Sequence, residues 1–83
     1  MPKVIIYTTD YCPYCKLAKN LLDQKAVAYE EIRIDLEEAK REEMMKLSGR
    51  KTVPQIFIND QPIGGYDDLA SLAKSGKLKE LLI

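Results

Sequence analysis

Histidine is absent from this 83-residue sequence. A cysteine protease or a similar hydrolase usually needs a nearby histidine to activate its thiol and to carry protons, so that class of enzyme is excluded. Any chemistry at cysteine must therefore depend on the thiolate itself. Cysteine is also scarce, because the chain has only 2 residues of this type. Two cysteines cannot form the disulfide framework of a small secreted protein.

The sequence also lacks an excess of charge and long apolar runs. Thirteen basic and thirteen acidic residues cancel, which removes the usual electrostatic argument for nucleic acid or an anionic membrane as a partner. Apolar residues make up 46% of the chain, but in runs of a few residues only, so no membrane span is expected. Met1-Pro2-Lys3 leads directly into a strand-like run, and we therefore expect no signal peptide and a cytoplasmic location. The length suits a single domain, residues 1–83.

Hydrophobic patterning predicts strands that alternate with helices. The predicted strands cover residues 4–7, 29–34, 55–58 and 61–63, and the predicted helices cover residues 13–26, 39–47, 67–73 and a short segment that ends at Ile83. The order βαβαββα with a helical extension predicts an α/β fold, in which helices cover a four-stranded mixed sheet. The first two strands should be parallel, because a helix connects them.

Individual residues specify several of these elements. Leu17, Ala18, Leu21 and Leu22 should form the buried face of the first helix, and Met44 and Leu47 that of the second. Asp35 should cap the second helix, and Ser48-Gly49 should end it. Asn59-Asp60 predicts a tight turn, and Pro62 suits an edge strand. Tyr7, Met44, Met45 and Phe57 are interpreted as packing residues.

The two cysteines form the motif Cys12-Pro13-Tyr14-Cys15 at the junction of the first strand and the first helix. Their spacing places both thiols on one face of the first helical turn, which suits reversible disulfide formation. The start of a helix favours a thiolate at Cys12, so Cys12 should attack first and the more covered Cys15 should resolve the mixed disulfide. One alternative is that both cysteines only pack in the core. A closed zinc site, which normally takes four Cys or His ligands, is the other alternative, and no metal is expected.

Three motifs occur in a fixed order: Cys12-Pro13-Tyr14-Cys15, then Thr52-Val53-Pro54, then Gly64-Gly65-Tyr66-Asp67-Asp68. With these motifs the sequence closely resembles the dithiol glutaredoxins of the thioredoxin-like superfamily, over nearly the whole chain. The resemblance implies a thioredoxin-like fold. It also implies an oxidoreductase that uses glutathione to reduce protein disulfides and glutathione mixed disulfides.

The resemblance further implies a groove that binds glutathione as the reducing co-substrate. Pro54 should be a cis residue, Val53 should pair with the cysteinyl part of glutathione, and Thr52 should line the same groove. Gly65 and the helix that follows should supply N–H donors for the γ-glutamyl carboxylate.

The remaining residues of the implied groove are acidic or aromatic. Asp67, with Asp68, should bind the glutathione ammonium group, although both also suit plain helix caps. Tyr14 should flank the glutathione sulfur, and Tyr66 should lie near the groove.

Two positions concern the glycine carboxylate of glutathione. Many glutaredoxins carry a lysine shortly before the first cysteine, where this chain has Thr9. By resemblance, Arg41 on the second helix is a candidate for the same carboxylate, and the alternative is a solvated charged helix face.

The expected partners are glutathione and client proteins that contain disulfides or glutathionylated thiols, and a monomer is expected. Two other functions stay open. One is a thioredoxin-like electron donor that a flavoprotein reductase serves. The other is an iron-sulfur carrier that uses Cys12 from two chains with two glutathiones, although Pro13-Tyr14 resembles the dithiol oxidoreductases more than the CGFS cluster carriers.

Overall fold

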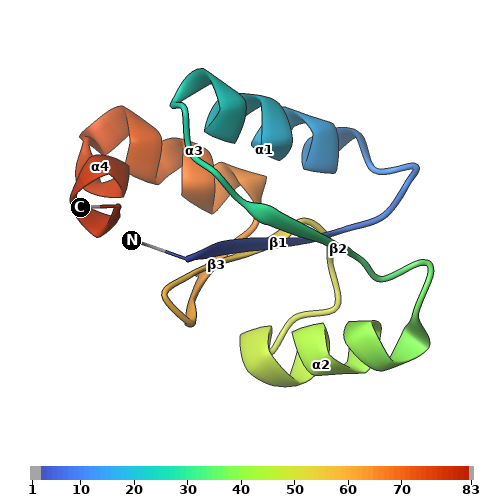
Figure 1. Ribbon diagram of the computed structural model, residues 1–83. Helices are drawn as coiled ribbons and strands as arrows, with labels where there is room; N and C mark the ends of the chain where they lie inside the picture. The colour runs from blue at the N-terminus through green and yellow to red at the C-terminus, as the bar shows by residue number, and fades with distance from the viewer. Residues whose placement is uncertain (1–2, 83) are drawn as a thin grey trace.

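The computed structural model describes residues 3–82. The elements are β1 (Val4–Thr8), α1 (Pro13–Gln24), β2 (Glu30–Arg33), α2 (Glu38–Ser48), β3 (Gln55–Ile58), β4 (Gln61–Gly64), α3 (Tyr66–Ser75) and α4 (Lys77–Leu81). This order confirms the predicted βαβαββα pattern with a helical extension (Figure 1). The predicted end of the last helix at Ile83 lies outside the described residues.

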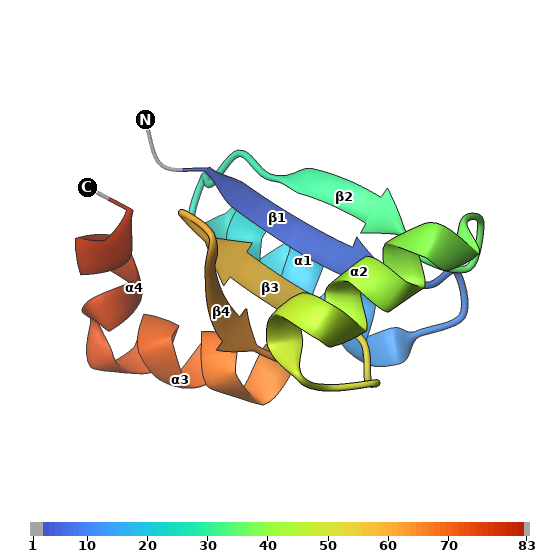
Figure 2. The same cartoon turned by 90° about the horizontal axis from the view of Figure 1, so that it is seen from below.

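The four strands form one sheet in the order β2-β1-β3-β4 (Figure 2). β1 and β2 are parallel, whereas β3 is antiparallel to both β1 and β4, which confirms the predicted mixed sheet. Asn59 and Asp60 have φ angles of 51° and 69°, as a two-residue type I′ hairpin requires. Pro62 lies on the edge strand β4, where its missing N–H costs the sheet no hydrogen bond to a further strand.

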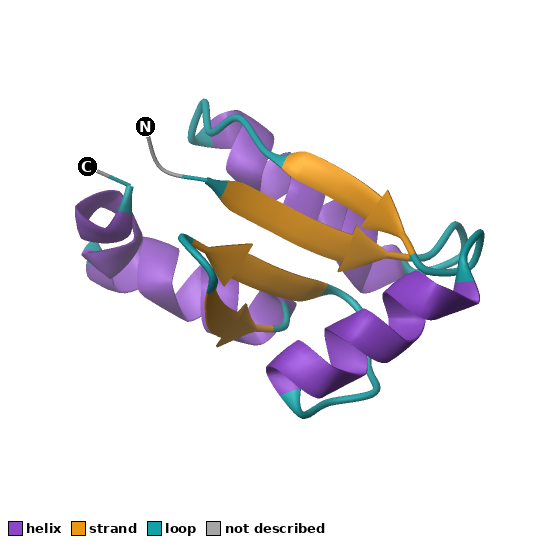
Figure 3. Cartoon of the chain, turned by 60° about the horizontal axis from the view of Figure 1, so that its bottom comes forward, coloured by secondary structure: helices purple, strands orange, loops and turns teal. Residues whose placement is uncertain are grey.

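Helices cover both faces of the sheet: α1 and α3 lie on one side and α2 on the other (Figures 1 and 3). Side chains alternate along a strand, so β1 and β3 each contribute to a core on both faces of the sheet. The core under α1 and α3 contains Val4, Ile6, Ala18, Leu22, Ile56, Ile58, Leu69 and Leu78. The core under α2 contains Tyr7, Ile34, Met44 and Phe57. Tyr7 and Phe57 pack edge to face with ring centroids 5.5 Å apart, which confirms their packing role.

Two predicted core residues are exposed instead. Leu17 is 44% exposed and Leu47 is 54% exposed. The buried residues of α1 are Cys15, Ala18 and Leu22, spaced three and four positions apart, and Leu17 lies about 100° around the helix from Ala18. A helix that covers only part of one sheet face buries a narrow stripe of its own surface. The hydrophobic pattern alone therefore overestimated how much of the helix surface is buried.

The predicted cap of the second helix was wrong. Helix α2 begins at Glu38 with Glu37 at the N-cap position. Asp35 instead accepts two hydrogen bonds from the Arg33 guanidinium, at 2.8 Å and 2.6 Å. The charged guanidinium two residues away is a stronger partner for this carboxylate than a backbone N–H. The other end of the helix is as predicted, because Gly49 adopts the left-handed conformation with φ 72°.

Candidate active site at Cys12 and Cys15

Cys12 occupies the N-cap position of α1 in an extended conformation, with φ −97° and ψ 110°. Its Sγ accepts a hydrogen bond from the N–H of Cys15 at 3.3 Å. The Cys12 thiol also faces the Val53 carbonyl oxygen, at 3.5 Å. The first turn of α1 contains no acidic side chain. Because Cys12 is the N-cap residue, the positive end of the helix is directed at its sulfur, and no acidic side chain in the first turn offsets that positive end. This arrangement favours a negative charge on the sulfur.

Cys15 lies one turn deeper and is only 1% exposed, because it shares the inner face of α1 with Ala18 and Leu22. Burial, together with the hydrogen bond to the Cys12 sulfur, raises the pKa of the Cys15 thiol to about 12. Cys15 therefore keeps its proton at neutral pH. Both cysteines are free thiols, and Cys12 is only partly covered. The difference in exposure agrees with the predicted order, in which Cys12 reacts first.

A groove of about 200 Å³ lies beside Cys12. Its walls come from the start of α1, the loop between α2 and β3, and the start of α3. The lining residues are Tyr14, Arg50, Thr52, Val53, Pro54, Gly65, Tyr66, Asp67 and Asp68. The structure thus brings together every residue predicted for the glutathione groove except Arg41. The cis peptide at Val53-Pro54 is confirmed, whereas binding of glutathione by these residues stays a prediction.

The start of α3 forms one wall of this groove. Gly65 is the N-cap residue, and its N–H donates to Asp68 Oδ2 at 3.1 Å. The same oxygen lies 3.3 Å from Nη1 of Arg50. Asp68 is thus occupied as the helix cap and ion-pair partner. Asp67 and Asp68 are both exposed, and both line the groove.

Two tyrosines also line the groove, Tyr14 from α1 and Tyr66 from α3. The rings of Tyr14 and Tyr66 lie 6.3 Å apart between centroids, at an angle of 31°. Tyr14 is largely exposed. These rings offer the groove an apolar surface, on which the body of a peptide-like ligand can pack.

Arg41 and Arg50 differ from the sequence-based picture of the site, and Thr9 does not line the groove. Arg41 lies on α2, is exposed, and does not line the groove. Thr9 is buried, and its Oγ1 has no hydrogen-bond partner among residues 3–82. It cannot reach a ligand carboxylate as a lysine at that position would. Arg50 lines the groove but was missed from the sequence, where its only signal is a basic side chain two positions before Thr52.

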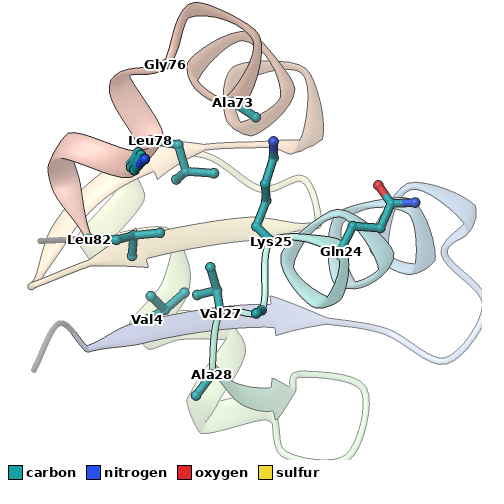
Figure 4. A pocket seen from close by; sticks show the side chains of 11 residues that line it. Val4, Gln24, Lys25, Val27, Ala28, Ala73, Gly76, Leu78 and Leu82 are labelled. Carbon is teal, nitrogen blue, oxygen red and sulfur yellow. The ribbon is translucent and has the colours of Figure 1, made fainter.

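A larger cavity of about 810 Å³ lies at the other end of the sheet (Figure 4). It is lined by apolar residues such as Val4, Val27, Leu78 and Leu82, with Lys25 beside them. Val4 begins β1, whereas Cys12 follows the end of that strand. This cavity therefore lies away from the thiols and is separate from the candidate active site.

A thioredoxin-like sheet with a thiol pair at the start of its first helix defines a thiol-disulfide oxidoreductase. Residues 4–63 match the Glutaredoxin family model. The chain is 57% identical over 82 residues to Glutaredoxin 3 of Escherichia coli strain K12, with 99% of each chain covered. It is 49% identical over 82 residues to Glutaredoxin of Pseudomonas aeruginosa, with 99% of this chain and 98% of the relative covered.

Solved structures agree with this assignment. The solution structure of glutaredoxin from Brucella melitensis has a TM-score of 0.85 at 49% identity and covers 96% of this chain and 87% of its own. A buckwheat glutaredoxin-glutathione complex has a TM-score of 0.89 at 32% identity. The match covers 98% of this chain and 76% of the buckwheat chain. The chain therefore belongs to the glutaredoxin family, and its redox-active pair is Cys12 and Cys15. No helix within residues 3–82 combines the length and the apolar character that crossing a membrane requires.

Proposed function

We propose that this chain uses glutathione to reduce protein disulfides and glutathione mixed disulfides. The observation that carries the proposal is the position of Cys12. Its sulfur is held at a helix start, 3.3 Å from the Cys15 backbone nitrogen. It also lies 3.5 Å from the carbonyl oxygen of Val53, which lines the groove. The buckwheat relative was solved as a glutaredoxin-glutathione complex, which supports the same ligand for this groove.

The reaction begins when the Cys12 thiolate attacks one sulfur of a client disulfide. A bond forms between Cys12 and that sulfur, and the other client sulfur leaves as a thiolate that takes up a proton. Cys15 then attacks Cys12, which releases the client as a thiol and leaves a Cys12–Cys15 disulfide. Two glutathione molecules reduce this disulfide and become oxidised glutathione. A glutathionylated client needs only Cys12, because a second glutathione resolves the mixed disulfide.

Glutathione binding is assigned to the groove residues as follows. The Val53 backbone pairs with the cysteinyl part of glutathione, Thr52 lines its path, and Tyr14 packs beside its sulfur. The N–H groups at the start of α3, next to Gly65, receive the γ-glutamyl carboxylate. Asp67 receives the ammonium group.

Other residues have supporting or competing roles in the groove. Asp68 holds Gly65 and Arg50 in place, and Tyr66 completes the wall with Tyr14. Arg50 is a candidate for the glycine carboxylate, because it already lines the groove. Arg41 would need to reach the same carboxylate from α2. Comparison of Arg50→Met with Arg41→Met by the KM for glutathione distinguishes the two.

A glutathione-coupled assay on wild type, Cys12→Ser and Cys15→Ser tests the proposal. With a small glutathione mixed disulfide as substrate, Cys12→Ser should be inactive and Cys15→Ser should stay active. With a protein disulfide, Cys15→Ser should lose most of its activity. Activity that persists in Cys12→Ser would overturn the assignment of the nucleophile. Rapid reduction by a flavoprotein reductase, without turnover by glutathione, would favour a thioredoxin-like donor instead.

Asp67→Asn tests the proposed ammonium site. Loss of one exposed carboxylate contact should raise the KM for glutathione about threefold to tenfold with little change in kcat. Lys40→Met in α2, which breaks an exposed pair with Glu43, is the control and should leave the KM unchanged. An unchanged KM in Asp67→Asn would exclude this carboxylate from binding.

The wider setting is proposed on the same basis. We infer that residues 1–83 act as one glutaredoxin domain, as a cytoplasmic monomer. Its partners are glutathione and disulfide-containing or glutathionylated client proteins.

A further inference from the structure

An ion pair lies one turn beyond Cys15 on α1. Lys19 Nζ lies 2.9 Å from Glu31 Oε2 on β2, and the same oxygen accepts the hydroxyl hydrogen of Thr8 on β1 at 2.6 Å. The Thr8 side chain is buried, whereas the Lys19 and Glu31 side chains are 28% and 31% exposed. A carboxylate anchored to the sheet thus holds the ammonium group in place.

Lys19 lies on the same face of α1 as Cys15, because it follows Cys15 by four residues, about one helical turn. Burial dominates the raised pKa of Cys15, but the positive charge of Lys19 and the backbone of Thr9 act in the opposite direction. The helical spacing therefore places the Lys19 side chain one turn from the buried thiol, on the same side of α1.

The pair itself stays ionised near neutral pH. The hydrogen bond to Glu31 raises the pKa of Lys19. The Thr8 hydroxyl, followed by Lys19, lowers the pKa of Glu31. Lys19 therefore carries a full proton and cannot serve as the base that deprotonates Cys15. What it offers is a fixed positive charge.

The other groups around this network do not titrate in the relevant pH range. Tyr29, next to β2, has a pKa raised by burial and by Asp23 of α1, so it stays neutral. Arg33 on β2 has a pKa raised by its hydrogen bonds with Asp35 and stays charged. These groups therefore keep their charge state near neutral pH.

We propose that Lys19, held by Glu31 and Thr8, is a positioning residue for the resolving step, where it stabilises the thiolate of Cys15. The inference rests on the proposed function, because it needs a mixed disulfide at Cys12. Cys15 loses its proton and its sulfur bonds to Cys12 Sγ, while the bond between Cys12 and the client sulfur breaks. The client sulfur leaves as a thiolate and takes up one proton. The disulfide is exchanged, so no outside oxidant is needed.

Stopped-flow reaction of the reduced protein with dithiobis-nitrobenzoate separates the two steps. Cys12 releases the first coloured thiolate at a rate that depends on reagent concentration, and Cys15 releases the second in a step that does not. Lys19→Met should slow the second phase about tenfold at neutral pH and move its pH-rate profile upward by about one unit. The first phase should change less than about twofold. Glu31→Gln should slow the second phase about threefold, and Lys19→Arg should stay within about threefold of wild type.

Controls distinguish the charge effect from damage to the fold. Lys40→Met breaks the exposed Lys40–Glu43 pair of α2, at 3.4 Å, and should leave both phases unchanged. An unchanged second phase in Lys19→Met would overturn the inference but leave the proposed function intact. Equal slowing of both phases would also overturn it, because the charge would then act on the whole fold. If Lys19→Met does not fold, Glu31→Gln becomes the test variant. An unchanged rate of the second phase in Glu31→Gln would then overturn the inference.

Other results would contradict the proposed function itself. These are a wild-type protein without a second phase, or a second phase that persists in Cys15→Ser. Neither result depends on Lys19.

Discussion

Brief alkylation of the reduced protein at neutral pH should modify Cys12 and leave Cys15 intact. Cys15 is 1% exposed, and burial raises its pKa to about 12. An ordinary cysteine has a pKa of about 8.5. At neutral pH the thiolate fraction of Cys15 is therefore about a thousandfold below that of an exposed cysteine, and restricted access slows the reaction further.

The assay is reaction with limiting iodoacetamide, quenching, digestion and mass measurement of each cysteine peptide. A Cys12→Ser variant removes competition for the reagent. In this variant the rate at Cys15 should rise about tenfold for each pH unit and show no plateau below about pH 10. The same variant in denaturant is the control, and there Cys15 should react as an ordinary thiol.

Two results would refute this reasoning. One is a native rate at Cys15 within about tenfold of the rate in denaturant at neutral pH. The other is a plateau near about pH 8.5, the behaviour of an exposed thiol. Either would mean that burial does not set the order in which the two thiols react.

The raised pKa of Cys15 also predicts how the stability of the protein depends on pH. Because the folded pKa of Cys15 lies above its unfolded value, the native protein keeps a proton that the unfolded chain releases. This contribution is complete below about pH 8.5 and is lost as the pH rises towards about 12. The free energy of unfolding, measured by denaturant titration, should fall with pH in this range, and less steeply in Cys15→Ala. Parallel curves for the two proteins would contradict the shift.

Two further changes test the groove wall and the turn before α2. Gly64 has φ 118° and a Cβ there would collide with the Asp68 carboxylate, so Gly64→Ala should cost about 3 kcal/mol in thermal unfolding. Gly49→Ala, with φ 72° and open space around it, should cost about 1 kcal/mol, and equal losses would exclude the collision. The Arg33 guanidinium lowers the pKa of Asp35 to about 2. Carboxyl NMR should show that the pKa of Asp35 rises to the ordinary range in Arg33→Met. In the wild type, the ion pair between Arg33 and Asp35 should be lost as the pH falls from about 4 to about 2.

Local patterns in the sequence were enough to predict the elements and their order. The apolar run Ile56-Phe57-Ile58 predicts a strand, which the structure buries on both faces, and Ser48-Gly49 marks a helix end, because these signals depend on near neighbours only. The same approach failed at Leu17 and Leu47. Whether such a leucine is buried depends on how much of the helix surface the sheet covers, and no local pattern contains that information.

The candidate site likewise contains residues that local patterns predict and residues that only the folded structure brings together. The positions of Cys12 and Cys15 follow from the helix start that the sequence predicts. Arg50 reaches the groove only because the loop before β3 meets the start of α3 at Asp68, 18 residues further along the chain. The contact of Lys19 with Glu31, and of Glu31 with Thr8, likewise depends on the packing of α1, β1 and β2. Such contacts between distant segments need the fold before they can be seen.

The hydrogen bond that Cys12 accepts from the Cys15 N–H is the one that an N-cap serine would accept. A thiol is a weak acceptor, so Cys12→Ser should stabilise the protein by about 0.5 kcal/mol. Denaturant titrations of both proteins at neutral pH would measure this difference in the free energy of unfolding. A lower free energy of unfolding in Cys12→Ser would mean that the side chain at this position does not cap the helix through the Cys15 N–H, because the better acceptor would then have brought no gain.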